Sequence, residues 1–158
     1  MPTNVLFVCL GNICRSPTAH GIFQRKVEQA GLRDSVLIES AGTGPWHVGK
    51  SPDARAQAKA LERGYDLSAL IAQQVSPQDF ERFDYILAMD ESNLEELQLI
   101  APEHYRGHLG LFLDFAPASG HREVPDPYYG GDQGFELVLD LVEEASDGLL
   151  NEIKSRSA

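Results

Sequence analysis

The chain has 158 residues, which is the usual size of one domain and too short for two comfortable ones. Its 13 basic and 24 acidic residues give a formal net charge of −11, which argues against duplex nucleic acid or an anionic membrane as the main partner. The hydrophobic share of 42% and the charged share of 23% are those of ordinary globular proteins, so the composition excludes disordered and collagen-like classes.

The first predicted element is a strand over Val5–Leu10. An unbroken apolar run of this length, followed by Gly11-Asn12, suits a strand that is buried on both faces of a parallel sheet. Ser16-Pro17 then supplies an N-cap and a proline at the first helical position, and apolar residues recur at helical spacing until Gly31 ends the helix. The chain therefore begins with a strand, a loop and a helix.

The same alternation continues toward the C-terminus. Further strands are expected at Val36–Ile38, Tyr85–Met89 and, more weakly, Leu109–Leu113. Further helices are expected at Ala54–Gly64, after the caps Ser76–Asp79 and Asp90, and at Phe135–Ile153. Strands that alternate with helices predict an α/β fold, namely one domain over residues 1–158 with a four-stranded, parallel, Rossmann-like sheet and helices on both faces. In such a fold the ligand site lies beyond the carboxyl ends of the strands.

Residues suited to chemistry gather in the loop after the first strand, Cys9-Leu10-Gly11-Asn12-Ile13-Cys14-Arg15-Ser16. Gly11 and Asn12 tolerate the left-handed backbone that turns successive N–H groups toward one point, and such a nest binds a tetrahedral oxyanion. The following helix adds its positive end, and the guanidinium of Arg15 can clamp two oxygens of the anion. Thiols in such surroundings lose their proton easily, so we expect Cys9 to attack phosphorus as a thiolate. A buried spectator cysteine is the competing interpretation, which the loop chemistry disfavours.

Two further residues complete the predicted chemistry. Ser16 is expected both to cap the helix and to donate its hydroxyl to the sulfur of Cys9. Displacement of an alcohol also requires a proton for the leaving oxygen, and Asp126, in Asp126-Pro127-Tyr128-Tyr129-Gly130-Gly131, is the candidate acid. Asp-Pro in a glycine-rich loop is more often only a turn. Three other acids, at expected caps or turns, compete with it: Asp53, Asp90 and Asp114.

Three segments together carry a resemblance to a known family: V-C-L-G-N-I-C-R-S-P at 8–17, F-D-Y-I-L-A-M-D-E-S-N at 83–93 and D-P-Y-Y-G at 126–130. They resemble the low-molecular-weight protein tyrosine phosphatases over essentially the whole chain. The resemblance implies a phosphotyrosine phosphatase I-like fold and the hydrolysis of phosphotyrosine or other aryl phosphate monoesters. It also implies that Cys9 is the nucleophile that forms a phosphocysteine, that Arg15 clamps the phosphate, and that Asp126 is the general acid and then the base.

The resemblance extends to residues around the phosphate loop. It implies that Asn12 shapes the loop, that Ser40 supports it through a hydrogen-bond network, and that the remaining loop residues bind substrate: Leu10, Gly11, Ile13, Cys14 and Ser16. The family often adds a histidine to this network, but the corresponding segment at 68–74, which contains Ala69, has none. The second loop cysteine of the family can form a reversible disulfide with the nucleophile, so Cys14 is expected either to make the activity redox-sensitive or to be a buried spectator.

A glycine-rich segment with the sole tryptophan, Trp46, matches the loop that lines the substrate cleft of this family. An indole there, with Tyr128 and Tyr129 opposite, would form a slot that favours aryl phosphates. The competing hypothesis is an exposed aromatic side chain without a role. We expect the neighbouring His47 to lie in solvent.

Two other functions on related folds stay open, an arsenate reductase and a phosphocarrier that passes on a phosphate from a phosphocysteine. Arsenate reductases that relay a disulfide need further downstream cysteines, and none follows Cys14. A phosphocarrier needs neither Arg15 nor Asp126. A binding module without turnover is disfavoured because Cys9, Arg15 and Asp126 are all present.

Location and cofactors are predicted from what the sequence lacks. No stretch approaches the roughly 18 apolar residues that a membrane helix needs, and no basic residues precede the short apolar run at the start. Two cysteines cannot form a disulfide framework, and the five histidines lack metal-ligand spacing. We therefore expect a cytoplasmic monomer that uses no metal or other cofactor and binds neither nucleic acid nor membranes.

Overall fold

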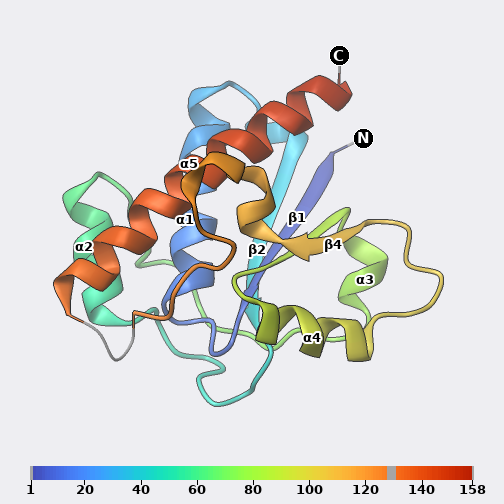
Figure 1. Ribbon diagram of the computed structural model, residues 1–158, viewed down its shortest axis with the longest axis horizontal. Helices are drawn as coiled ribbons and strands as arrows, with labels where there is room; N and C mark the ends of the chain where they lie inside the picture. Colours follow the sequence, from blue (N-terminus) through green and yellow to red (C-terminus); the bar gives the residue numbers. More distant parts are fainter. Residues whose placement is uncertain (1, 128–130, 158) are drawn as a thin grey trace.

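The computed structural model describes residues 2–127 and 131–157, in which one parallel sheet lies between helices (Figure 1). The strands of this part of the chain are β1 (Thr3–Cys9), β2 (Val36–Gly42), β3 (Tyr85–Ala88) and β4 (His108–Leu111). They lie in the order β2-β1-β3-β4, and each neighbouring pair is parallel. The predicted α/β fold is confirmed. Because the strands are parallel, their carboxyl ends meet at one edge of the sheet.

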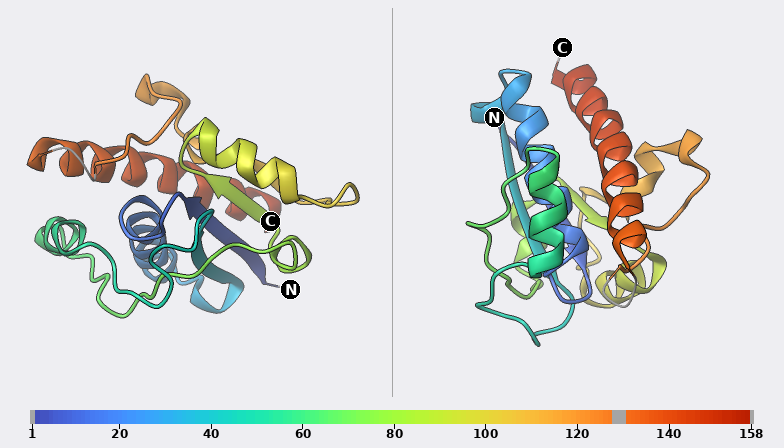
Figure 2. Two further views of the ribbon diagram at one scale, coloured as in Figure 1. Left: turned by 90° about the horizontal axis from the view of Figure 1, so that it is seen from below. Right: turned by 90° about the vertical axis from the view of Figure 1, so that its left-hand side faces the viewer.

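Helices connect these strands and cover the sheet. The α-helices are α1 (Arg15–Gln29), α2 (Ala54–Glu62), α3 (Asp79–Arg82), α4 (Glu91–Ile100) and α5 (Asp132–Ser157). Short 3-10 turns are η1 (Arg33–Ser35), η2 (Phe112–Phe115) and η3 (Pro117–Ser119). Helices α1 and α2 run in roughly the same direction, and α5 crosses and contacts both of them (Figure 2).

The side chains of β1 alternate between two hydrophobic cores, as the period of a strand requires. Val5, Phe7 and Cys9 belong to the core that α1 and α5 complete. Leu6 and Val8 belong to the core on the other face, which includes side chains of α3 and α4. Cys9 therefore lies on the face of the sheet that α1 covers.

Several elements differ from their sequence-based boundaries, and β2, β4 and α1 are the most informative of them. Strand β2 runs four residues beyond Ile38, because its backbone stays paired with β1 up to Cys9 and Gly42 although the apolar pattern has ended. Strand β4 ends at Leu111 and gives way to the 3-10 turn η2.

Helix α1 also differs, since it begins one residue before Ser16. Cys14 holds the N-cap position and makes no side-chain cap bond, so the prediction that Ser16 caps the helix is wrong. The hydroxyl of Ser16 instead contacts Cys9 and Asn12. The predicted caps at Asp53 and Asp90 are confirmed, because each carboxylate accepts a backbone N–H of the helix that follows it.

No helix in residues 2–127 and 131–157 combines the length and the apolar character that crossing a bilayer requires.

Candidate active site

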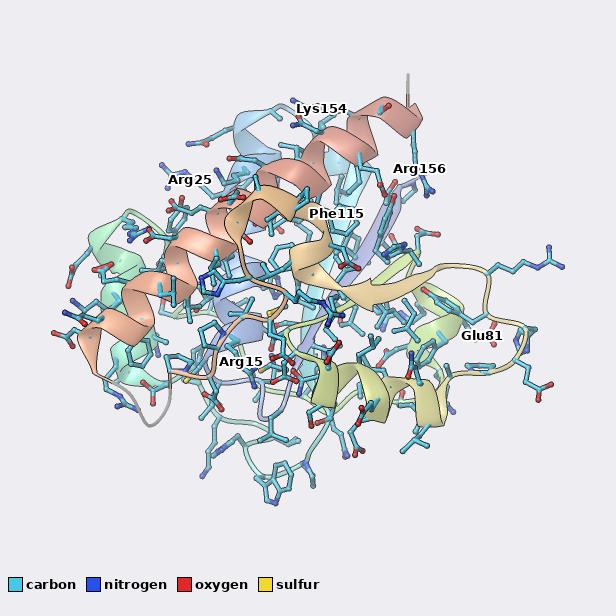
Figure 3. The ribbon with its side chains drawn as sticks, viewed as in Figure 1. Arg15, Arg25, Glu81, Phe115, Lys154 and Arg156 are labelled. Carbon is cyan, nitrogen blue, oxygen red and sulfur yellow. The ribbon has the colours of Figure 1, made fainter. Side chains whose placement is uncertain are left out.

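A pocket of about 190 Å³ lies at the carboxyl edge of the sheet, where the loop after β1 leads into α1. Its lining includes Cys9, Arg15 and Asp126, which carry a thiol, a guanidinium and a carboxylate. Figure 3 shows Arg15 at the start of α1, in the interior between α5 and α4. The rest of the lining consists of Leu10, Gly11, Ile13, Cys14, Trp46 and His47. The pocket thus pairs a charged end with a largely apolar wall.

The sulfur of Cys9 is held by two neighbouring groups. The backbone N–H of Asn12 donates to Cys9 Sγ at 3.2 Å, and the hydroxyl oxygen of Ser16 lies 3.0 Å from the same sulfur. The side chain of Cys9 is almost completely buried at the end of β1. The loop therefore fixes the position of the sulfur at the amino end of α1.

Asn12 adopts the left-handed backbone that the sequence predicts, with φ of 58°. Its side-chain amide is used at both ends, because Nδ2 donates to Ser16 Oγ at 2.7 Å and Oδ1 accepts the backbone N–H of Gln73 at 3.0 Å. Asn12 is buried, so the loss of either bond would leave a polar atom without a partner. The amide therefore holds the strained loop in a single shape.

The support of the loop continues through Ser40 on β2. The side chain of Gln73 donates from Nε2 to the Ser40 carbonyl at 2.9 Å, and Ser40 Oγ lies 3.1 Å from His20 Nδ1. Burial lowers the pKa of His20 to about 4, and Glu39 only partly opposes this effect. A neutral histidine of α1 and a glutamine of the histidine-free segment 68–74 thus lie in this network. The sequence analysis missed both.

Arg15 is buried and anchored by one of its two terminal nitrogens. Nη1 donates to Asp90 Oδ2 at 2.6 Å and to the Val124 carbonyl at 3.1 Å, whereas Nη2 lies 3.8 Å from Asp126 Oδ2. Burial alone would lower the pKa of Arg15, but the charges of Cys9 and Asp90 and the hydrogen bond to Asp90 raise it above its ordinary value. The guanidinium is thus held through one arm, and its other arm lies on the Asp126 side.

Asp90 has a second role that the sequence analysis did not predict. Its Oδ1 accepts the backbone N–H of Asn93 and caps α4, as expected, while its Oδ2 binds Arg15. The two contacts follow from the sheet order, because Asp90 stands just beyond the end of β3, which lies next to β1. One carboxylate therefore fixes both a helix end and the loop arginine.

Asp126 lies at the mouth of the pocket with its side chain 38% exposed. The segment before it is fixed to the sheet, because Val124 N–H donates to the Met89 carbonyl at 2.8 Å. The Asp126 carboxyl group is exposed to solvent on one side and faces Arg15 on the other. This position suits a group that exchanges protons with a substrate. Tyr128 and Tyr129, the predicted aromatic partners, lie outside the described residues.

Trp46 and His47 line the open side of the pocket. Trp46 is 64% exposed, and its ring lies so close to Gly44 that a Cβ at position 44 would be 1.7 Å from it, so any other residue there would displace the ring. The prediction that His47 lies in solvent is wrong. Its ring is half-buried and packs against the phosphate loop, where a Cβ at Gly11 would meet His47 Cδ2 at 2.9 Å.

Gly42, at the end of β2, is a further supporting residue that the sequence analysis missed. A Cβ there would lie 2.9 Å from the Leu10 carbonyl oxygen, 3.0 Å from the backbone of Gly11 and 3.1 Å from the Asn12 nitrogen. These neighbours are backbone atoms of the phosphate loop, which cannot rotate away. Glycine at this position lets β2 press directly against the loop.

Cys14 is buried, and its thiol is protonated at neutral pH. Burial raises the pKa of Cys14 to about 12, with the charges of Asp53, Cys9 and Asp126 adding to the effect and Arg55 opposing it. Attack on a disulfide or a peroxide requires a thiolate, so Cys14 is a poor nucleophile at neutral pH. Its redox role stays a prediction. Within the described residues, no group of three or more His, Cys, Asp or Glu side chains could hold a metal ion.

Comparison with known proteins gives concordant results. The family model for low molecular weight phosphotyrosine protein phosphatase matches residues 4–158. A putative low molecular weight protein-tyrosine-phosphatase of Synechocystis sp. is 46% identical over 150 residues, which cover 94% of this chain and 95% of the relative.

Solved structures agree with this match. A protein tyrosine phosphatase from Entamoeba histolytica, with Hepes in its active site, has a TM-score of 0.94 at 38% identity and covers 99% of both chains. A Drosophila arginine phosphatase has a TM-score of 0.89 at 34% identity, over 95% of this chain and 97% of the other. The similarity therefore spans every segment that lines the pocket.

Proposed function

Because this chain belongs to the low molecular weight phosphotyrosine protein phosphatase family and is a protein-tyrosine phosphatase, we propose that Cys9, Arg15 and Asp126 are the residues that perform its catalysis. Their substrates are phosphotyrosine and other aryl phosphate monoesters. The observation that carries the proposal is the convergence of a thiol, a guanidinium and a carboxylate on one pocket at the amino end of a helix. Each of the three supplies a different requirement of phosphoryl transfer.

The first displacement transfers the phosphoryl group to the protein. In the first turn of α1, Pro17 has no N–H and Thr18 N–H donates to the Cys14 carbonyl. The N–H groups of Arg15 and Ser16, together with the Arg15 guanidinium, can therefore hold the phosphate oxygens. The Cys9 thiolate attacks phosphorus, an S–P bond forms, and the bond from phosphorus to the phenolic oxygen breaks. Asp126 gives its proton to that oxygen, so tyrosine leaves as a neutral phenol.

The second displacement releases phosphate. The Asp126 carboxylate, now deprotonated, takes a proton from a water molecule that attacks the phosphocysteine. The S–P bond breaks, and the thiolate leaves beside the hydroxyl of Ser16, 3.0 Å from the sulfur, which can donate a hydrogen bond to the anion. Inorganic phosphate departs, and both Cys9 and Asp126 return to their starting states.

The pocket wall favours an aryl group over a charged one. Leu10, Ile13 and Trp46 present apolar surface beside the charged end, which suits the ring of phosphotyrosine. The guanidinium of a phosphoarginine, the group suggested by the name of the Drosophila relative, would instead lose solvation against this wall and lie near Arg15. Phosphoarginine is therefore the competitor against which aryl phosphates are to be compared.

The proposal includes the setting in which the protein acts. We infer one catalytic domain over residues 1–158 that works as a monomer, without a metal, on phosphoproteins of the cytoplasm. The chain length supports one domain, and the net charge of −11 disfavours polyanionic partners such as nucleic acid.

Leaving-group dependence tests the roles of these residues. In Asp126→Ala, kcat for phosphotyrosine should fall by about 10²- to 10⁴-fold, because a general acid contributes that much to a poor leaving group. Turnover of p-nitrophenyl phosphate, whose leaving group needs little protonation, should fall much less. Asp114→Ala, which removes an exposed acid, is the matched control and should change neither rate. Equal losses for the two substrates would contradict the acid role of Asp126.

A further inference from the structure

Large apolar side chains are exposed in an uneven distribution. Within the described residues, those with the highest exposure are Leu10, Leu37, Trp46, Val48, Leu61, Ile71 and Leu99. Four of these seven come from three segments that meet beside the active-site pocket, and we call them the apolar rim: Leu10, Trp46, Val48 and Ile71. Single exposed apolar residues are ordinary, but apolar surface gathered at one place marks a site of interaction.

Hydrogen bonds join the three segments of the rim. The Leu10 carbonyl accepts Gly44 N–H at 3.0 Å, which ties the phosphate loop to the loop that carries Trp46 and Val48. Gly49 N–H donates to the Ala72 carbonyl, and Ala72 N–H donates to the Lys50 carbonyl, both at 2.9 Å. Val48 and Ile71 each adjoin one of these bonded residues. Figure 1 shows the loop that follows β2 projecting from the edge of the sheet where β1 leads into α1.

The rim is ordered before any ligand binds. Within its central loop, Val48 N–H donates to the Pro45 carbonyl at 3.2 Å and Lys50 N–H donates to the His47 carbonyl at 2.9 Å. The ring of Trp46 lies against the backbone of Gly44. A surface that is already held in shape loses little conformational entropy on binding. Its apolar side chains are therefore available as a preformed contact.

The rim and the pocket share residues, and this identifies what covers the rim. Leu10 and Trp46 belong to both, so a group seated over Cys9 brings whatever is attached to it over Val48 and Ile71. The pocket, at about 190 Å³, is below the roughly 300 Å³ at which ligand sites usually begin, so it holds little more than one side chain. The remainder of a polypeptide substrate has to lie outside it.

We propose that the apolar rim binds an apolar side chain of the substrate polypeptide, located within three residues of the phosphotyrosine. This inference rests on the proposed function and names the class of phosphoprotein that the site prefers. Three residues of extended chain span roughly 10 Å, which reaches from the pocket mouth across a neighbouring loop. Leucine, isoleucine, valine or phenylalanine near the phosphotyrosine would bury apolar surface against Val48 and Ile71.

Paired phosphopeptides test the proposal. One peptide carries leucine two residues before and two residues after the phosphotyrosine, and its partner carries glutamine at both positions, so that charge and length are equal. We expect the wild-type protein to show a kcat/KM about tenfold higher for the leucine peptide, which corresponds to about 1.4 kcal/mol. In the double variant Val48→Ser/Ile71→Ser, the ratio of kcat/KM between the two peptides should fall to about 1.

The matched control is Leu61→Ser/Leu99→Ser, which removes two exposed apolar side chains outside the rim. This variant should keep the tenfold ratio, since substitutions of exposed side chains rarely disturb the fold. The proposal is overturned if wild type treats both peptides equally, or if both double variants behave alike. A dimer would also overturn the proposal. Sedimentation would then show that wild type is dimeric and that Val48→Ser/Ile71→Ser is monomeric, while the ratio of kcat/KM between the peptides stays unchanged in the variant. A second copy of the chain, and not the substrate, would then cover the rim.

The result also separates this proposal from the one on which it rests. If wild type hydrolyses p-nitrophenyl phosphate and has the same kcat/KM for the two peptides, only the docking role of the rim fails. If none of the three substrates is hydrolysed, the proposed function itself fails and the docking role fails with it.

Discussion

Asp90 provides a quantitative test of how the arginine of the phosphate loop is held. Its Oδ2 contacts Arg15 Nη1 at 2.6 Å, and the two side chains are 22% and 4% exposed. Removal of one partner of a buried ion pair costs about 3–5 kcal/mol. Because Asp90 is partly exposed and the Val124 carbonyl still binds Arg15, we expect Asp90→Asn to lower the free energy of unfolding by about 2 kcal/mol.

Two substitutions at position 90 separate the ion pair from the helix cap. Asparagine can still accept the backbone N–H of Asn93, whereas alanine cannot, so Asp90→Ala should cost about 1 kcal/mol more than Asp90→Asn. Both variants remove the ion pair from the anchored arm of Arg15 and leave it only the Val124 carbonyl, and a displacement of about 1 Å near the reacting atoms can reduce a rate by about 100-fold. We therefore expect kcat/KM to fall by about 10- to 100-fold in both.

Urea unfolding and steady-state kinetics with p-nitrophenyl phosphate measure the two effects. Asp114→Asn is the control, because it removes an exposed carboxylate and should change the free energy of unfolding by less than about 0.5 kcal/mol. If Asp90→Asn keeps the stability and the kcat/KM of wild type, the ion pair does not position Arg15 and the reasoning is refuted.

Three further predictions concern the support of the loop. Gly42→Ala places a Cβ about 3 Å from loop backbone atoms and should lower kcat/KM at least tenfold in steady-state assays; an unchanged value would show that the loop can yield. The pKa of His20 is lowered to about 4 in the folded protein, so the neutral ring contributes fully to the free energy of unfolding above pH 6.5, and this contribution decreases as the pH falls toward 4. Urea unfolding should therefore show a loss of about 1–2 kcal/mol between pH 7 and pH 5 that is absent in His20→Gln, and parallel curves would contradict this. The raised pKa of Cys14 predicts that iodoacetamide at pH 7 leaves Cys14 unmodified; peptide mass spectrometry would reveal this, and rapid alkylation of Cys14 would contradict it.

The strand, loop and helix around Cys9 could be predicted because their signals are local. An apolar run before Gly11-Asn12 indicates a buried strand and a turn, and an acidic residue before an apolar period indicates a helix cap, as at Asp53 and Asp90. The same local reading placed the cap of α1 at Ser16. This prediction was wrong because the Ser16 hydroxyl contacts Cys9 and Asn12 instead, and the local sequence pattern does not indicate these contacts.

The supports of the site could not be predicted because they join distant parts of the chain. The Arg15–Asp90 pair spans 75 residues and the bond from Gln73 to Asn12 spans 61. Both depend on which strand lies beside β1, and the alternation of elements in the sequence does not fix that order. The histidine near Ser40 likewise comes from α1 rather than from the segment 68–74. The chemistry of the loop together with the resemblance to a family supplied the candidate residues, and the sheet order explains how they are held.

The covalent intermediate provides the most direct test of the account. We would mix the Asp126→Ala variant with p-nitrophenyl phosphate, quench with acid within milliseconds, and measure the peptide masses. The good leaving group allows the first displacement, whereas loss of the base slows the second, so the peptide containing Cys9 should gain the mass of one phosphoryl group. That gain should be absent in Cys9→Ser, which should also lose turnover. A phosphoryl group on any other residue, or a Cys9→Ser variant as fast as wild type, would contradict the account.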